Sequence, residues 1–198
     1  NNSGSCFTGK LLFVSHADAV AVFPGGFGTQ DELFEALTLV QTGKSNIIPI
    51  VLLEGPHGEY WRNWSHYIQK NLLDNGWISP EDTGIYHIAK DLDEAVEHVL
   101  RFYRVFHSSR YVGPILVLRL RQKLSEPQLA QMNEELGELE KRGRIEQRGP
   151  LDGERDHLDL PRLAFEHNRG RYGRLRMMID RINELAVGGA KVGVGSRG

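Results

Sequence analysis

The stretch Phe23-Pro24-Gly25-Gly26-Phe27-Gly28-Thr29-Gln30-Asp31-Glu32 decides the fold of this chain, because it joins an apolar strand to an amphipathic helix through a glycine-rich turn. The strand is predicted over residues 19–23, and Pro24 ends it because proline has no amide hydrogen to donate to a sheet. The three glycines are expected to let backbone amides turn toward a ligand. Helix N-terminal amides and the helix dipole favour an anion such as a phosphate at this kind of junction.

Length and composition are typical of a soluble globular protein with one large or two small domains. The chain has 198 residues, of which 40% are hydrophobic and 25% are charged. It contains no stretch long and apolar enough to span a membrane, and it does not begin with a pattern typical of a signal peptide. The single cysteine, Cys6, excludes an internal disulfide and a thiolate metal site, so a reducing cytoplasm is the expected compartment.

Charge is distributed unevenly along the chain. Residues 1–100 contain 5 Lys and Arg against 13 Asp and Glu, whereas residues 101–198 contain 19 against 13. This change coincides with a change of hydrophobic pattern and therefore indicates a domain boundary. Arginines alternate with acidic residues in the second half, as on solvated helix faces, so nucleic acid is not an expected partner.

Short apolar runs alternate with helical patterns in the first part of the chain. This is typical of a Rossmann-like α/β fold, a parallel sheet flanked by helices. The predicted helices are 10–15, 30–42, 60–72 and 92–106, and the predicted strands are 19–23, 47–53 and 85–89. Ile47–Leu53 is apolar throughout and is expected at the centre of the sheet. Only one clear strand precedes the glycine turn, so part of the sheet is expected upstream of residue 1.

The second part predicts a small α+β unit of βαββα order. Its strands are expected at 115–120, 144–147 and 163–167, and its helices at 126–141 and 172–185. The predicted organisation is a Rossmann-like domain over 1–110, the βαββα extension over 111–187 and a disordered tail over 188–198.

Spacing alone leaves two interpretations of the segment from Thr29 to Glu32. In the structural one, the Thr29 hydroxyl caps the helix and the Glu32 carboxylate reaches back to the Thr29 amide as a capping box. In the functional one, the glycine turn binds the phosphate of a nucleoside monophosphate and Glu32 lies near its ribose. Cleavage of the N-glycosidic bond develops positive charge on the sugar, which a nearby carboxylate stabilises.

The nine residues from Pro24 to Glu32 resemble the signature of the Lonely Guy (LOG) family of nucleotide phosphoribohydrolases. The resemblance covers about residues 7–105 and includes Asp18-Ala19, Leu33-Phe34-Glu35, Gln41, Pro49-Ile50-Val51-Leu52-Leu53 and Tyr60-Trp61. From Phe102 onward the chain resembles the C-terminal extension of longer bacterial members. Such proteins are often labelled lysine decarboxylase-like, although nothing in this sequence resembles a pyridoxal-phosphate lysine site.

The resemblance implies a Rossmann-like homodimer without a metal or redox cofactor. Its implied reaction is hydrolysis of cytokinin riboside 5′-monophosphates, or of purine nucleotides such as AMP, to free base and ribose 5-phosphate. Glu32 is implied to be catalytic. The implied substrate- and phosphate-binding residues are Gly25, Gly26, Gly28, Thr29 and Lys10.

Two departures from the family pattern bear on activity. Gly9 stands where the family has an arginine thought to act on the substrate. The family's N-terminal strands, with their own glycine-rich loop and part of the base pocket, have no counterpart in this sequence. If the sequence is complete as given, weak or no turnover is expected.

The remaining candidate residues favour structural roles. The histidines share no metal-ligand spacing and are expected mostly on the surface: His16, His57, His66, His87 and His98. The stripe of Trp61, Trp64 and Tyr67 at helical spacing is expected to pack or to form a dimer contact rather than to stack on bases. Glu35 and Gln41 lie farther along the glycine-turn helix, where either could line the pocket.

Three functions remain open at this stage. The first is a phosphoribohydrolase acting on nucleoside 5′-monophosphates, and the second is a non-catalytic nucleotide-binding module that keeps the glycine turn. The third, a dinucleotide-dependent oxidoreductase, is disfavoured because Gly25-Gly26-Phe27-Gly28 does not have the spacing of the dinucleotide fingerprint.

Overall fold

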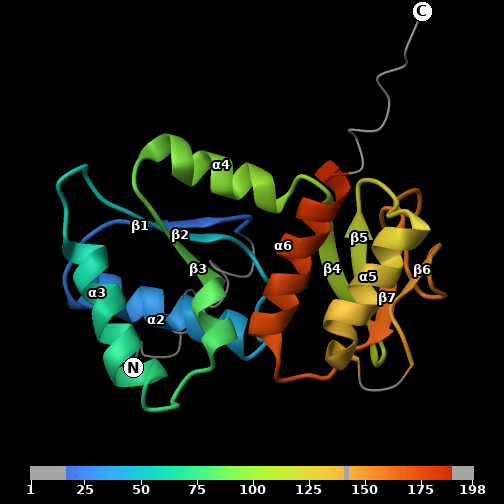
Figure 1. Cartoon of the computed structure of the whole chain (residues 1–198), viewed down its shortest axis with the longest axis horizontal. Coiled ribbons are helices and arrows are strands. Elements are labelled where there is room, and N and C mark those ends of the chain that lie inside the picture. Colours follow the sequence, from blue (N-terminus) through green and yellow to red (C-terminus); the bar gives the residue numbers. More distant parts are fainter. Residues whose placement is uncertain (1–16, 141–142, 189–198) are drawn as a thin grey trace, which may run out of the picture. The chain divides into compact units, whose positions relative to one another are not determined.

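The computed structural model describes residues 17–140 and 143–188 (Figure 1). The chain divides into two compact units, one containing the residues up to Leu100 together with Gly170–Arg176, and the other containing Arg101–Arg169 and the residues from Met177 onward. Lys10, the expected helix at 10–15 and most of the expected tail lie outside the described residues.

The first unit is built on a parallel three-stranded sheet, as predicted. Its strands are β1 (Val20–Val22), β2 (Ile50–Leu53) and β3 (Tyr86–Ala89), in the order β1-β2-β3. All four β2 residues are buried, which confirms the prediction of a central strand. Val22 pairs with Leu52, so the carboxyl ends of β1 and β2 lie side by side.

Helices cover both faces of this sheet. The helix α4 (Leu92–Phe102) lies on one face, and α2 (Phe27–Gln41) and α3 (Tyr60–Ile68) lie on the other (Figure 1). A buried apolar cluster joins Val51, Leu53 and Ala89 of the sheet to Ala95 of α4. The predicted helix over 60–72 changes at Gln69–Leu73 to a π-helical turn, η1, and a 3-10 helix, η2 (Pro80–Ile85), precedes β3.

The second unit contains an antiparallel four-stranded sheet of order β4-β5-β7-β6. The strands are β4 (Phe106–Val112), β5 (Ile115–Leu120), β6 (Glu146–Arg148) and β7 (Arg162–Glu166). The helix α5 (Glu126–Leu136) is followed by a 3-10 turn, η3 (Gly137–Leu139), and α6 (Tyr172–Gly188) ends the described chain. The βαββα pattern is therefore preceded by one additional strand, β4.

The sequence pattern missed β4 because it extended the helix after Leu92 to Phe106. In the structure α4 ends at Phe102, and β4 and β5 form a hairpin through the two residues Gly113 and Pro114. Gly113 has φ +59°, the left-handed conformation that glycine supplies in such tight hairpin turns. The Gly-Pro pair directly before the apolar run of β5 was the signal for this turn.

Three buried charged side chains of the second unit form one group. The Glu154 carboxylate accepts hydrogen bonds from Arg119 at 3.0 Å and from Arg162 at 2.8 Å, and all three side chains are almost fully buried. Such a group is costly to break because it would leave a buried charge without its partner.

The segment Gly170–Arg176 packs within the first unit. A Cβ atom on Gly173 would lie 2.7 Å from the backbone of Glu81, so there is no room for a side chain at this position. The buried Arg176 side chain donates to the carbonyl of Ile85 at 3.4 Å, and Arg174 forms an ion pair with Glu81 at 3.1 Å. Residues 170–176 therefore contribute to the core of the unit that contains the glycine turn.

Replacing Gly43 by alanine is expected to destabilise the first unit by about 2–5 kcal/mol. Gly43 has φ +67°, and a Cβ atom there would overlap the ring of Tyr172. Left-handed strain costs about 1–2 kcal/mol and overpacking about 1–3 kcal/mol more. Urea unfolding followed by tryptophan fluorescence measures this unit, because all three tryptophans (Trp61, Trp64 and Trp77) lie in it.

The matched control is Gly76→Ala. Gly76 has φ +71° but open space around its Cβ position, so only the left-handed strain of about 1–2 kcal/mol is expected. Equal destabilisation by the two substitutions would contradict a packing role for the contact between Gly43 and Tyr172.

Candidate functional site

The glycine turn leads directly into α2. The strand β1 ends at Val22, Gly26 is the N-cap residue with φ −85° and ψ −156°, and the helix begins at Phe27. The amide of Gln30 makes a hydrogen bond of 3.2 Å to the Gly26 carbonyl, so the amides of residues 27–29 precede the helical ladder and have no acceptor within the helix. They form the N-terminal end of a 15-residue helix, which favours an anion.

The capping-box interpretation of Thr29 and Glu32, one of the two left open by the sequence, is wrong. Because α2 begins three residues earlier than the predicted helix over 30–42, Thr29 lies inside the first turn and Gly26 takes the cap position. Among the described residues, no side chain caps this helix end. The structural explanation for the spacing of Thr29 and Glu32 therefore does not apply.

The three glycines of the turn are explained by the room around their Cβ positions and not by unusual backbone angles. Gly25, Gly26 and Gly28 all lie outside the positive-φ region. A Cβ atom on Gly25 would overlap the Thr29 hydroxyl, so this glycine is required by packing. Cβ atoms on Gly26 and Gly28 would have no described atom within 4 Å, so these two glycines leave open space at the helix end.

Glu32 lies on α2 just beyond this open space. Its side chain is exposed, and Glu35 follows one turn along the same side of the helix and is half-buried. Two aromatic side chains flank the turn: Phe23 is 58% exposed and Phe27 is 98% exposed. The structure thus brings the predicted residues Gly25, Gly26, Gly28, Thr29 and Glu32 together around one helix end, whereas Lys10 lies outside the described residues.

Tyr60 connects α3 to the glycine turn. Its hydroxyl donates a hydrogen bond of 2.5 Å to the Gly25 carbonyl and accepts one of 2.6 Å from the Gln30 side-chain amide. The sequence placed Tyr60 in a helix and in the family resemblance but did not predict this contact, because Tyr60 lies 35 residues from Gly25 in an aromatic-rich segment.

Glu54 positions the beginning of α3. Its carboxylate follows β2 directly and accepts hydrogen bonds from the amides of Tyr60 at 3.0 Å and of Trp61 at 3.3 Å. The Trp61 indole is fully buried and donates to the Leu53 carbonyl at 3.2 Å. An acidic residue at the carboxyl end of a predicted central strand was the signal for a functional position here.

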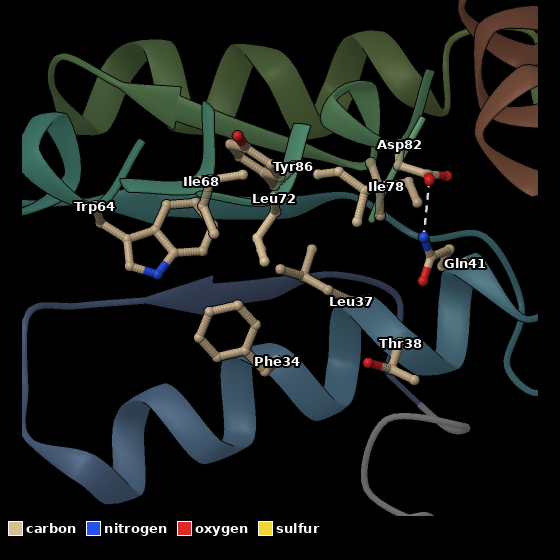
Figure 2. A pocket seen from close by; sticks show the side chains of 11 residues that line it. Phe34, Leu37, Thr38, Gln41, Trp64, Ile68, Leu72, Ile78, Asp82 and Tyr86 are labelled. Carbon is tan, nitrogen blue, oxygen red and sulfur yellow. Dashed lines mark hydrogen bonds between the residues drawn. The ribbon is translucent and has the colours of Figure 1, made fainter. Parts of the chain in front are cut away.

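A separate apolar pocket of about 90 Å³ lies between α2, α3 and η2 (Figure 2). On α2 it is lined by Phe34, Leu37, Thr38 and Gln41, which form one stripe at helical spacing. Glu32 precedes Phe34 by two residues and so lies on a different side of α2. Gln41 closes one end of the pocket by donating to the Asp82 carboxylate at 2.7 Å, and it therefore does not share a site with Glu32.

Of the other aromatic and histidine candidates, four make ring contacts: Trp61, Trp64, His87 and His98. His57 and His66 are exposed, and His16 lies outside the described residues. Trp61 and Trp64 are buried and contact each other edge to face at 5.9 Å, while Tyr67 is 53% exposed. His87 stacks on His98 at 4.2 Å and lies 3.1 Å from the Glu94 carboxylate. Among the described residues, no three His, Cys, Asp or Glu side chains are grouped as metal ligands. No helix in the described part of the chain is long and apolar enough to span a membrane.

Comparisons with known proteins agree with the motif. Residues 5–99 match a family model described as "Possible lysine decarboxylase". A cytokinin riboside 5′-monophosphate phosphoribohydrolase of Rhodococcoides fascians is 36% identical over 87 residues, which are 44% of this chain and 42% of that protein. The proteins of the same name from Mycobacterium tuberculosis and Arabidopsis thaliana are 40% identical over 73 residues and 32% identical over 89 residues, and these segments cover 36% and 44% of this chain and 36% and 39% of those proteins.

The chain thus spans about two fifths of the length of these relatives. The matched region contains the glycine turn, Glu32 and Tyr60. The resemblance of this part of the chain to the Lonely Guy family of phosphoribohydrolases is therefore confirmed, over residues 5–99.

Proposed function

We propose that this chain hydrolyses the N-glycosidic bond of nucleoside 5′-monophosphates, releasing the free base and ribose 5-phosphate. The observation that carries the proposal is the pairing of Gly26 and Gly28 with Glu32 at one helix end. Neither backbone angle nor packing among the described residues requires glycine at positions 26 and 28. Close approach of a ligand to the backbone explains glycine at both positions.

In this proposal the helix end binds the phosphate of the substrate and Glu32 lies beside its ribose. The amides of the first turn favour the phosphate, because the helix dipole and the amide hydrogens both attract an anion. Glu32 lies four residues beyond Gly28, which is about 6 Å along the helix axis. A ribose attached to the bound phosphate would therefore lie beside the Glu32 carboxylate.

In the proposed reaction, the bond between C1′ and the base nitrogen breaks and water adds its oxygen to C1′. The base leaves with the electron pair of the bond and takes up a proton. The sugar carries positive charge in the transition state, and the Glu32 carboxylate stabilises that charge and orients the attacking water.

The similarity to phosphoribohydrolases named for cytokinin riboside 5′-monophosphates supports an N6-prenylated adenosine monophosphate as one substrate and AMP as another. We also propose that the protein is a homodimer and that it acts in the cytoplasm. The residues that would bind substrate are Gly25, Gly26, Gly28 and Thr29, together with Lys10.

Glu32→Gln is expected to lower the rate constant of base release from AMP by about 100- to 1000-fold, which is typical for loss of one transition-state stabiliser. The affinity for AMP should change little, since the phosphate contacts remain. Release of adenine and ribose 5-phosphate measures the first quantity and titration calorimetry the second. Glu97→Gln, the same change at an exposed position of α4, is the control and should retain full activity.

Full activity of the Glu32→Gln variant would contradict the catalytic role. If the unmodified chain binds AMP but releases no base, the chain is instead a nucleotide-binding module that has kept the glycine turn.

Gly28→Ala is expected to raise stability and lower nucleotide affinity. Alanine is favoured over glycine within a helix by up to about 1 kcal/mol, and its methyl group meets no described atom. The same methyl group would occupy the space proposed for the phosphate, so the dissociation constant for AMP should rise about tenfold or more. Because stability should rise while AMP affinity falls, a loss of affinity in this variant cannot come from a loss of folding.

Gly137→Ala is the matched control for this measurement. Gly137 also has helical angles (φ −58°, ψ −22°) and open space at its Cβ position, but it lies in the second unit. This variant should leave AMP affinity unchanged. A Gly28→Ala variant with the affinity of the unmodified chain would place the phosphate elsewhere.

A further inference from the structure

The Tyr60 hydroxyl holds the first peptide group of the glycine turn in one orientation. It donates to the Gly25 carbonyl at 2.5 Å, and Gln30 donates to the hydroxyl oxygen at 2.6 Å. Because Gln30 supplies a hydrogen to that oxygen, the hydroxyl hydrogen is directed to the Gly25 carbonyl rather than to Gln30. The direction of both hydrogen bonds is therefore fixed by the pair of side chains.

Tyr60 itself is positioned by residues other than the glycines. Glu54 binds the first amides of α3, and the Tyr60 ring contacts the buried Trp61 indole edge to face at 4.7 Å. A Cβ atom on Gly58 would overlap the Glu54 carboxylate, so the loop before α3 lies close against this carboxylate. The hydroxyl thus projects from a rigid support toward the turn.

The orientation of the Gly25 carbonyl decides where the Gly26 amide points. In a planar trans peptide the carbonyl and the following N–H point in opposite directions. Since the Gly25 carbonyl points to Tyr60, the Gly26 N–H points away from Tyr60. A peptide between two glycines meets little steric resistance to rotation, because neither residue has a Cβ atom. The flipped peptide would direct a carbonyl oxygen where the amide now points, and would repel an anion.

We propose that Tyr60 is a positioning residue for phosphate binding, which keeps the Gly25–Gly26 peptide in the orientation that presents the Gly26 amide to a nucleoside monophosphate. This inference rests on the proposed function for its ligand, and on the two hydrogen bonds of Tyr60 for its mechanism. Tyr60 touches neither the reacting bond nor the sugar in this mechanism, so it acts on substrate binding more than on the chemical step.

The test compares Tyr60→Phe with Tyr67→Phe. Both substitutions remove one hydroxyl from α3, and Tyr67 is 53% exposed. A hydrogen bond contributes about 0.5–1.5 kcal/mol net, which corresponds to a two- to twelvefold effect. Tyr60→Phe should therefore raise the dissociation constant for AMP and for ribose 5-phosphate, and the KM for AMP, by about three- to tenfold. Its kcat should stay within about twofold, and Tyr67→Phe should change none of these.

Hydrogen exchange of the amides of residues 25–29, without ligand, gives a second readout. Tyr60→Phe should accelerate exchange by about three- to tenfold if the hydroxyl orders the turn, while Tyr67→Phe leaves it unchanged. Gln30→Met removes the other hydrogen bond and should give a smaller effect. The free-energy change in the double variant should be smaller than the sum of the changes in the two single variants, because both hydrogen bonds act on the same peptide group.

Unchanged affinity and exchange in Tyr60→Phe would overturn the inference. A lower kcat at unchanged KM would also overturn it, since that result assigns Tyr60 to the chemical step. If the unmodified chain binds no AMP or ribose 5-phosphate, the proposed function is contradicted and phosphate positioning is overturned with it. Faster exchange in Tyr60→Phe would then show only that the hydroxyl orders the turn.

Discussion

The Glu54 carboxylate fixes the geometry on which the candidate site depends. It follows β2 directly and accepts hydrogen bonds from the first two amides of α3, at 3.0 and 3.3 Å. These bonds satisfy amides that a helix cannot pair internally, and they suit the positive end of the helix dipole. They also set the place of the Tyr60 hydroxyl, which binds the Gly25 carbonyl. One carboxylate at a strand end thereby connects the second strand, the third helix and the glycine turn.

The parallel register of the sheet makes this connection possible. Val22 pairs with Leu52, so the glycine turn after β1 and Glu54 after β2 emerge at the same edge of the sheet. Ligands of open parallel sheets bind outside this edge, at the carboxyl ends of the strands. The turn and Glu32 come from one segment and Tyr60 comes from another, and the three gather at this edge. The apolar pocket beside Phe34 and Gln41 opens on a different side of α2 and is structurally independent of them.

Much of this arrangement could be predicted from the sequence because its signals are local. The apolar run at Ile47–Leu53 indicated a central strand, and the glycines after Pro24 indicated a turn before a helix. The predicted helix start was wrong by three residues, since glycines at 26 and 28 weigh against a helix by propensity while the tertiary structure extends α2 back to Phe27. The hydrogen bond between Tyr60 and Gly25 joins residues 35 positions apart, and β4 was hidden by an apolar pattern that continued from the preceding helix. Neither has a periodic signature.

The family match ends at residue 99, but the compact unit that contains the glycine turn does not. Residues 170–176 return to it, with Arg174 paired to Glu81 and Arg176 buried against the Ile85 carbonyl. The first hundred residues carry a net charge of −8, and Arg174 from the second half of the chain pairs with one of their acidic side chains. Both arginines bind η2, whose Asp82 accepts a hydrogen bond from Gln41 in the last turn of α2. The end of α2 is therefore connected through η2 to residues 170–176, which lie beyond the first hundred residues.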